Sequence, residues 1–420
     1  MLDIRVIREN PELVRQASVN KSNELDVAAI LELDDRRREL IADADSLKAE
    51  RNAVSAEIPK KKKAGEPVEE VFARMREVGD RIAELDERLR VTESQLAELQ
   101  LRAPNIPHES VQVGNEAENK IVRDWGVVPE FDFDPLPHWE IGPKLGILDL
   151  EAGARVSGSG FYFLKGAGAR LQRALISYML DTHVADGFTE ISAPHLVNSG
   201  SMTGTGQLPK MKDDMYEIER DELWLIPTGE VPVTNMHRNE ILPADSLPLS
   251  YVAYTPCFRR EAGSAGKDTR GMIRVHQFDK VEMVKFVKPE TSYDELEILT
   301  LQAEKILRGL EIPYRVLQLA TGDLSFASSK TYDLELWAAG ARSWLEISSV
   351  SNFESFQARR MNTRFRTAEK KVDFPHTLNG SGLALARLIP AILENFQTAD
   401  GKVVAPAVLH PYMGGLTVIE

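Results

Sequence analysis

The chain has 420 residues, which is long for one domain and sufficient for two. Hydrophobic residues make up 43% and charged residues 28%, as in a globular protein with a substantial core. The only cysteine is Cys257, which excludes an intrachain disulfide and a zinc site built from several thiolates, so no zinc is expected.

The first ten residues, MLDIRVIREN, do not form an apolar signal segment, because charged residues interrupt them. No uninterrupted apolar run is long enough to cross a bilayer. We therefore expect a cytoplasmic protein without a membrane partner. The formal net charge of −14 argues against nucleic acid as an average over the chain, but binding depends on where the basic residues gather.

The first hundred residues carry two long runs of heptad spacing. Asn10 and Pro11 favour a helix start, with Asn10 as the cap. In residues 30–58 and 68–99, apolar side chains recur at alternating steps of three and four residues. Two such runs joined by a short linker predict an antiparallel helical hairpin, or coiled coil, with about 32 residues per helix and a length of about 48 Å.

The linker of this hairpin spans residues 59–67 and has a proline at each end, so both helices are expected to stop there. Between the prolines lie four consecutive lysines, which are expected at the tip of the arm. They are Lys60, Lys61, Lys62 and Lys63. Such a run has two interpretations that the arm alone does not separate: a solvated turn, or a contact site for phosphate groups.

The segment APNIP at residues 103–107 predicts a boundary between an arm domain, 1–103, and a second domain, 104–420. Beyond it, short apolar stretches alternate with turns, and helical patterns intervene at 171–186, 293–310 and 383–395. This order favours an α+β fold in which a mainly antiparallel sheet is flanked by helices. Neither a GxxxxGK[ST] phosphate loop nor a GxGxxG turn after a strand is present.

The most informative stretch, residues 257–278, reads CFRREAGSAGKDTRGMIRVHQF. It predicts a strand with Arg259 and Glu261, a glycine-rich basic loop, and a returning strand with Arg274. Side chains two residues apart share one face of a strand, so Arg259 and Glu261 project together. Arginine suits phosphate, because its planar fork bonds two oxygens and stays charged. The alternative interpretation is an ordinary salt-bridged hairpin.

This stretch resembles motif 2 of the class II aminoacyl-tRNA synthetases, and its wording is similar to that of the seryl-tRNA synthetases in particular. Four further segments resemble that family in the expected order. They are ISAP at 191–194 (motif 1, at the dimer interface), TGE at 228–230 (the serine-binding TxE loop), EISS at 346–349 (an ATP- and metal-binding strand) and NGSGLALAR at 379–387 (motif 3). The resemblance covers essentially the whole chain, including the arm.

The resemblance implies an ATP site with magnesium. Arg259 would hold the α-phosphate, Arg274 would hold the outer phosphates, and Arg387 would enclose the adenine together with Phe278. These three arginines are the expected catalytic residues. A Mg2+ ion bound with ATP would have Glu346 and Ser349 as ligands. The implied ATP-binding residues are Arg259, Arg260, Glu261, Arg274, Val275, Phe278, Glu346, Ile347, Ser348, Ser349 and Arg387.

The resemblance also implies a pocket for L-serine. The loop of Thr228, Gly229 and Glu230 would receive the ammonium group, while Glu282 and Ser381 would lie near the hydroxyl. Taken singly, a strand glutamate is usually a solvated residue, and a serine between glycines is usually part of a flexible turn. The five motifs in the right order favour the functional interpretation. His276 is expected to be structural, because no acid–base step needs it.

A chain of this family would activate L-serine with ATP to seryl-adenylate and transfer serine to the 3′ acceptor end of tRNA(Ser). The four lysines of the arm would contact the long variable arm of the RNA, and a homodimer would have Pro194 near the subunit contact. Whether tRNA(Sec) is also charged is left open.

Two alternative functions remain. A synthetase-like relative that charges a carrier protein is expected to lack the arm. A coiled-coil interaction protein with an inactive synthetase domain is expected to have lost Arg259, Glu346 or Arg387, all of which are present.

Overall fold

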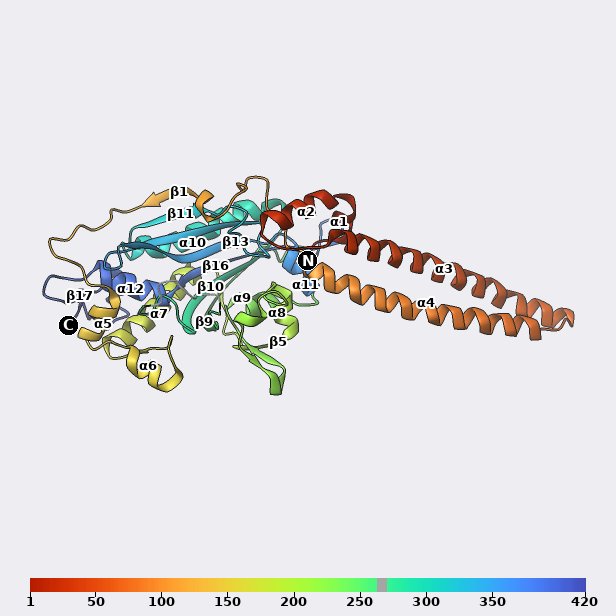
Figure 1. Ribbon diagram of the computed structural model, residues 1–420, viewed down its shortest axis with the longest axis horizontal. Helices are drawn as coiled ribbons and strands as arrows, with labels where there is room; N and C mark the ends of the chain where they lie inside the picture. The colour runs from red at the N-terminus through yellow and green to blue at the C-terminus, as the bar shows by residue number, and fades with distance from the viewer. Residues whose placement is uncertain (263–269) are drawn as a thin grey trace. The chain divides into compact units, whose positions relative to one another are not determined.

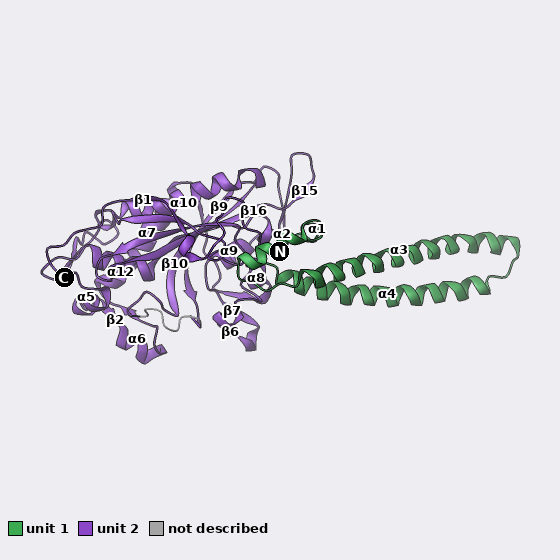
Figure 2. Cartoon of the chain, turned by 45° about the horizontal axis from the view of Figure 1, so that its top comes forward, with its two compact units in different colours: residues 1–104 green, residues 105–420 purple. Residues whose placement is uncertain are grey.

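The computed structural model describes residues 1–262 and 270–420, so most of the glycine-rich loop expected before Arg274 lies outside the described residues. The chain divides into two compact units, Met1–Pro104 and Asn105–Glu420, which Figure 2 shows in different colours. Among the described residues, no helix is both long enough and apolar enough to span a membrane.

The first unit is entirely helical. Its helices are α1 (Ile4–Glu9), α2 (Pro11–Asn20), α3 (Val27–Ala64) and α4 (Glu69–Leu101). Helix α2 begins at Pro11 as predicted, but the side chain of Asn10 makes no capping hydrogen bond. The long helices α3 and α4 run side by side in both views (Figures 1 and 2), and this confirms the predicted helical hairpin.

The seam of the hairpin is formed by the apolar residues of the two heptad runs. Ile30 and Leu40 of α3 and Ile82 and Leu96 of α4 are buried, because their spacing keeps them on the face that meets the other helix. Thr92 fills a seam position that lacks an apolar residue, and its hydroxyl donates to the carbonyl of Arg88 at 2.9 Å. The polar group is thus satisfied within its own helix.

The expectation that Pro59 ends the first helix is wrong. Helix α3 continues through Pro59 to Ala64, so the four lysines lie on its last turns and not in a linker. The surrounding turn is exposed, so solvent can satisfy the carbonyl that proline leaves without a donor. The helix is capped instead by Gly65, whose φ of 71° is left-handed and whose N–H donates to the carbonyls of Lys61 and Lys62. Lysines in a last helical turn are favoured by the helix dipole.

The second unit is built on an eight-stranded sheet (Figure 1). Neighbouring strands of this sheet are antiparallel, except for the edge pair β4–β9, which is parallel. This confirms the predicted α+β fold with a mainly antiparallel sheet. In spatial order the strands are β1 (Lys120–Trp125), β11 (Tyr314–Gln318), β12 (Lys330–Ala338), β13 (Ser343–Asn352), β16 (His376–Ala384), β10 (Gln277–Val287), β9 (Leu249–Phe258) and β4 (Thr189–Glu190).

Three helices pack on the sheet and form the main core: α7 (Ala167–Ala185), α10 (Ser292–Gly309) and α12 (Leu385–Asn395). They lie close to the three predicted helical segments. On strand β10, Val281 and Met283 belong to this core, whereas Lys280 and Glu282 face a cavity on the opposite side. The two-residue period of the strand thus separates the hydrophobic core from the polar site.

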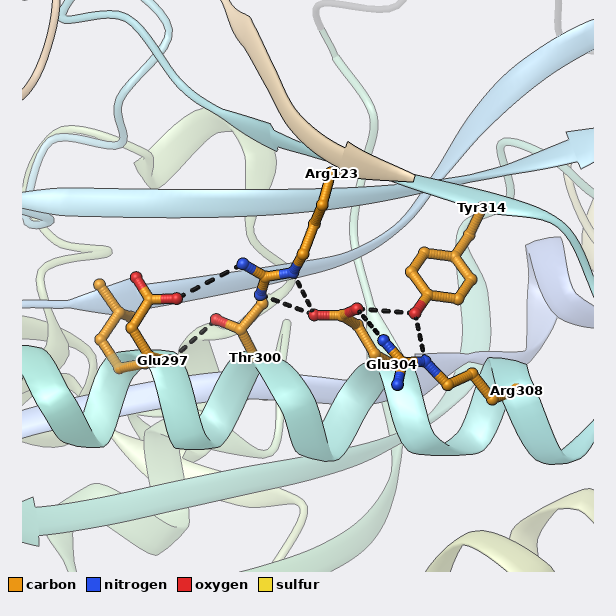
Figure 3. A network of polar contacts seen from close by, with 7 residues as sticks. Arg123, Glu297, Thr300, Glu304, Arg308 and Tyr314 are labelled. Atoms are coloured by element: carbon orange, nitrogen blue, oxygen red, sulfur yellow. Dashed lines mark hydrogen bonds and ion pairs between the residues drawn. The ribbon is translucent and has the colours of Figure 1, made fainter. Parts of the chain in front are cut away.

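A polar network ties the edge strand β1 to helix α10 (Figure 3). The carboxylate of Glu304 is buried, and one of its oxygens accepts from Nε of Arg123 at 2.7 Å. The other oxygen accepts from the Tyr314 hydroxyl at 2.6 Å and from Arg308 at 3.0 Å. Burial raises the pKa of Tyr314, and its hydrogen bond to Glu304 acts in the same direction. A buried carboxylate with three donors is a stable anchor for an edge strand.

The remaining elements are short. The helices are α5 (His138–Lys144), α6 (Leu150–Ser157), α8 (Ser199–Thr205), α9 (Glu230–Asn235) and α11 (Phe356–Met361). The small sheets consist of β2 (Leu148–Asp149) with β3 (Phe163–Leu164); β5 (Leu196–Asn198) with β7 (Leu223–Leu225) and β6 (Glu217–Ile218); β8 (Ile241–Leu242) with β14 (Arg364–Arg366) and β15 (Val372–Asp373); and β17 (Val403–Val404) with β18 (Val418–Ile419).

Candidate active site

A cavity of about 290 Å³ lies against the face of the sheet opposite the core helices. Its walls come from the turn before α9, the end of β9, strands β10, β13 and β16, and the start of α12. The structure brings most of the predicted site residues together here. They are Thr228, Glu230, Arg259, Glu261, Arg274, Val275, Phe278, Glu282, Glu346, Ile347, Ser348, Ser349, Ser381 and Arg387.

The other predicted residues lie outside this lining. Gly229 packs behind it, since a Cβ there would lie 3.1 Å from Oγ1 of Thr255. Arg260 is exposed, and its backbone N–H donates to the carbonyl of Asp214 at 2.8 Å. Pro194 is exposed beyond the edge strand β4, and the four lysines belong to the other unit.

One end of the cavity is lined by arginines and one aromatic ring. The guanidinium of Arg259 lies 5.2 Å from the centroid of Phe278, a cation–π contact that orients both side chains. Arg274 contacts Oε2 of Glu261 at 3.1 Å. Arg387 lies 3.4 Å from a carboxylate oxygen of Glu346. Three guanidinium groups around one partly enclosed space favour a ligand with several negative charges, such as a polyphosphate.

His276 supports this end from behind. Its Nδ1 lies 3.1 Å from the carbonyl oxygen of Arg259, so this nitrogen carries the hydrogen, and the backbone N–H of Arg259 donates to the carbonyl of His276 at 2.9 Å. These contacts hold the backbone that positions Arg259.

The other end of the cavity is acidic and buried. Burial and the nearby charge of Glu282 together raise the pKa of Glu230 to about 7, and a hydrogen bond from Gln357 opposes the shift. The Gln357 amide donates to Oε1 of Glu230 at 2.6 Å. Glu282 forms an ion pair with Lys280, the neighbouring residue on the same face of β10. This end is suited to a small cationic group that can lie beside a carboxylate.

Three residues that interact with Glu230 were not predicted from the sequence: Lys280, Gln357 and Asn379. Lys280 had a usable signal, because a residue between Phe278 and Glu282 at even spacing must share their face of the strand. Gln357 had none, since it lies on the short helix α11, far from the acidic residues in sequence. Its carbonyl oxygen accepts from the Thr377 hydroxyl at 2.7 Å, which fixes its amide toward Glu230.

The oxygen ligands of Glu346 and Ser349 are compatible with a magnesium ion. Both residues line the cavity, and Ser349 pairs across the sheet with Asp333 of β12. Oδ1 of Asp333 is buried without a hydrogen-bond partner among the described residues. Burial and the nearby charge of Glu346 raise the pKa of Asp333 well above its usual value. A divalent cation in this place would favour the ionised form of Asp333 and lower this pKa, and Mg2+ prefers such oxygen ligands.

Two family descriptions match the chain. "Seryl-tRNA synthetase N-terminal domain" matches residues 1–107, and "tRNA synthetase class II core domain (G, H, P, S and T)" matches residues 214–396. The serine–tRNA ligase of Caldicellulosiruptor bescii is 58% identical, with 99% of each chain covered. That of Geobacter sulfurreducens is 55% identical over the full length of both chains. The chain belongs to the seryl-tRNA synthetase family.

Solved structures of this family agree with the fold. The crystal structure of a seryl-tRNA synthetase from Pyrococcus horikoshii, complexed with ATP, has a TM-score of 0.94 and 40% identity. The similarity covers 100% of the present chain and 99% of that one. A prolyl-tRNA synthetase from Giardia lamblia has a TM-score of 0.58 at 15% identity, and this shows only that the two share the class II fold.

Proposed function

Membership of the family makes the chain an ATP-dependent ligase that joins serine to transfer RNA, and we propose how its cavity does so. The observation that carries the proposal is the division of one cavity into an arginine-lined end and a buried acidic end. ATP binds at the first and serine at the second. The carboxylate of serine then lies between them, where it can attack the α-phosphorus in line and expel pyrophosphate.

Catalysis of this step depends on position and charge. Arg259 holds the α-phosphate and stabilises the negative charge that develops there, while Arg274 holds the outer phosphates. Adenine lies between Phe278 and Arg387. The reaction needs no nucleophile from the protein, which agrees with the placement of His276 behind the cavity, against the backbone of Arg259. In the second step, the 3′ hydroxyl of transfer RNA attacks the acyl carbon of seryl-adenylate.

Magnesium would bind together with ATP. Glu346 and Ser349 would hold it, and when bound it would neutralise charge on the phosphates. The orphaned carboxylate oxygen of Asp333 beside Ser349 supports a cation in this place.

The serine pocket takes the ammonium group on Glu230, beside Thr228, and the hydroxyl on Glu282 and Ser381. Glu282 and Ser381 are directly paired in the register of strands β10 and β16, so their side chains can reach one small group.

The RNA and the second subunit are proposed on different grounds. The lysines at the end of α3 are mostly exposed and gather positive charge in an acidic protein, which suits contact with the long variable arm of tRNA(Ser). A homodimer with Pro194 near its contact would extend the sheet edge at β4. Light scattering tests this, since a concentration-independent monomer of 46.9 kDa would contradict the dimer. The cytoplasmic location stays a prediction.

The experiment that tests the proposed function is serine-dependent exchange of pyrophosphate into ATP, followed by charging of tRNA(Ser). The full-length chain should catalyse exchange only with serine, ATP and Mg2+ present together. A chain that charges RNA without supporting exchange would contradict the adenylate step. A chain active in neither assay would contradict the proposal as a whole.

A further inference from the structure

Lys280 is buried in the wall of the cavity, at the acidic end. It is 6% exposed, and its ion-pair partner Glu282 is 2% exposed. Two charges in such a place are costly to desolvate, and replacing a buried ion pair by apolar residues is often neutral or even stabilising. Stability alone therefore does not explain why a lysine is buried at this position. The contacts that Lys280 makes within the pocket indicate its role.

The first of these contacts decides what Thr228 can do. Oγ1 of Thr228 accepts from Nζ of Lys280 at 2.9 Å and from the backbone N–H of Glu230 at 3.2 Å. Both donors can only donate, so they occupy the two lone pairs of the hydroxyl oxygen. Its own hydrogen then points to Oε2 of Glu282, at 3.4 Å. With Lys280 in place, Thr228 has no lone pair left for a substrate ammonium, which must turn to Glu230.

The second contact decides how Glu282 is presented. Lys280 and Thr228 both bind Oε2, so one oxygen of this carboxylate is committed. The contacts of Glu282 with Lys280 and Thr228 leave its other oxygen, Oε1, without a hydrogen-bond partner among the described residues. Ser381 lies directly opposite on β16. The free oxygen of Glu282 is thus the acceptor available to a small hydroxyl group in this corner.

Lys280 also affects the balance of charge at the acidic end. Glu282 and Glu230 are two buried carboxylates that repel each other. Lys280 is the cation in direct contact with one of them, and it offsets that repulsion. The oxygens of a carboxylate paired with an ammonium group act as hydrogen-bond acceptors. A hydroxyl satisfies such an oxygen and a methyl group leaves it buried and unpaired, which is the arrangement that rejects a substrate without a hydroxyl.

We propose that Lys280 is a positioning residue for amino acid selection: it fixes Glu282 so that Oε1 faces the hydroxyl of serine, and it directs the ammonium group to Glu230. The proposal deepens the function given above and rests on it. Lys280 does not touch the reacting atoms, and it acts through Glu282 and Thr228.

The test uses the full-length chain and its Lys280→Met variant, which keeps the length of the side chain and removes the charge. We measure kcat/KM for serine and for alanine in pyrophosphate exchange, and KM for ATP. The preference for serine over alanine should fall by roughly 10²-fold, because Glu282 loses the ammonium group that holds its Oε2. KM for ATP should change less than twofold, since Lys280 is not expected to contact the nucleotide. A merely structural defect would raise both KM values, and an unchanged preference would overturn the proposal.

Two further variants keep the result interpretable. If Lys280→Met does not fold, Lys280→Gln is measured in its place with the same two outcomes. Adding Lys280→Met to a Glu282→Gln background should change the serine preference less than threefold, because Lys280 acts through Glu282; a further tenfold loss would contradict that. If the unaltered chain shows no serine-dependent exchange, the proposed function fails; if it does and the variants keep their preference, only the role of Lys280 fails.

Discussion

The lysines of the two units differ in their exposure and in their pairing. At the end of α3, Lys60, Lys62 and Lys63 are exposed and their charge faces solvent. In the cavity, Lys280 is buried, and its ammonium group contacts Glu282 and Thr228. An exposed ion pair contributes about 0–1 kcal/mol, whereas breaking a buried one by removing a single partner costs about 3–5 kcal/mol.

This difference indicates which kind of binding each unit can provide. Exposed lysines keep their counterions until phosphate displaces them, so they contribute affinity that depends strongly on salt. Buried charges are already paired within the protein, so they contribute by orienting neighbouring groups toward one ligand. We therefore expect changes in the arm to alter RNA binding and changes in the cavity to alter amino acid activation.

The largest effect should come from the substrate. Alanine lacks the hydroxyl that Glu282 and Ser381 would bind, so these buried groups would stay unpaired in its complex. Sites of this kind reject such an analogue by roughly 10⁴-fold or more. Exchange rates measured with serine and with alanine test the assignment of Glu282 and Ser381 to the hydroxyl. Comparable rates would show that the acidic end does not bind this group.

The next effect should come from Arg259→Ala, which removes one contact to the charge that develops on the α-phosphate. Loss of one preorganised contact of this kind typically costs about 10²–10³ in rate. Pyrophosphate exchange and thermal melting should be measured together. Arg220→Ala is the matched control, because Arg220 is exposed and does not line the cavity. An Arg259→Ala chain with normal melting and normal exchange would mean that Arg259 is structural.

A smaller effect should come from pH. The pKa of Glu230 is raised to about 7 by burial and by Glu282, so below pH 7 this carboxyl is mostly protonated and cannot pair with an ammonium group. KM for serine should therefore rise about tenfold per pH unit below 7 and level off above it. The same linkage predicts that serine binding releases up to about 0.8 proton at pH 6.5 and nearly none at pH 8.5.

Calorimetry of serine binding in two buffers of different ionisation enthalpy measures that proton. The Glu230→Gln variant provides the control, since it should bind serine weakly and without this dependence on pH. Proton release that is the same at both pH values would place the titrating group elsewhere.

The same contrast explains how far the sequence could predict the structure. Heptad spacing is a local property, and it predicted the hairpin correctly, with Ile30 and Ile82 in the seam. The end of the first helix was predicted wrongly, because Pro59 is only one local preference, whereas Gly65 supplies a left-handed residue that completes the terminal hydrogen bonds.

The cavity shows a different limit. Motif residues such as Arg259 and Glu346 are far apart in sequence, and only the resemblance to a family predicted that they meet. Gln357 belongs to no motif, and its role follows from a hydrogen bond across the fold. Lys280 lies two residues beyond the motif 2 stretch and could have been placed on its face by strand alternation, but its pairing with Glu282 and Thr228 required the structure.

The smallest effect on activation should come from the arm. Changing Lys60, Lys61, Lys62 and Lys63 to alanine removes positive charge from the end of α3 and leaves the cavity residues unchanged, since all of those lie in the other unit. Pyrophosphate exchange should stay within twofold of the unaltered chain. If all four lysines contact phosphate, the slope of log affinity for tRNA(Ser) against log salt should flatten by up to about 3–4, at roughly 0.7–0.9 per contact.

A single-residue pair distinguishes contact with RNA from a general loss of charge. Lys62 and Lys48 lie on the same helix, but Lys48 is already paired with Asp86 at 3.1 Å, whereas Lys62 lies over the exposed ring of Phe72. Lys62→Ala should flatten the salt slope by about 0.7–0.9, while Lys48→Ala should leave it nearly unchanged, because a paired ammonium displaces fewer counterions. Equal changes in both variants would mean that RNA senses only the net charge of the arm. No change in either would mean that the lysines form a solvated helix end, and the role of the arm would then have to rest on its other surfaces.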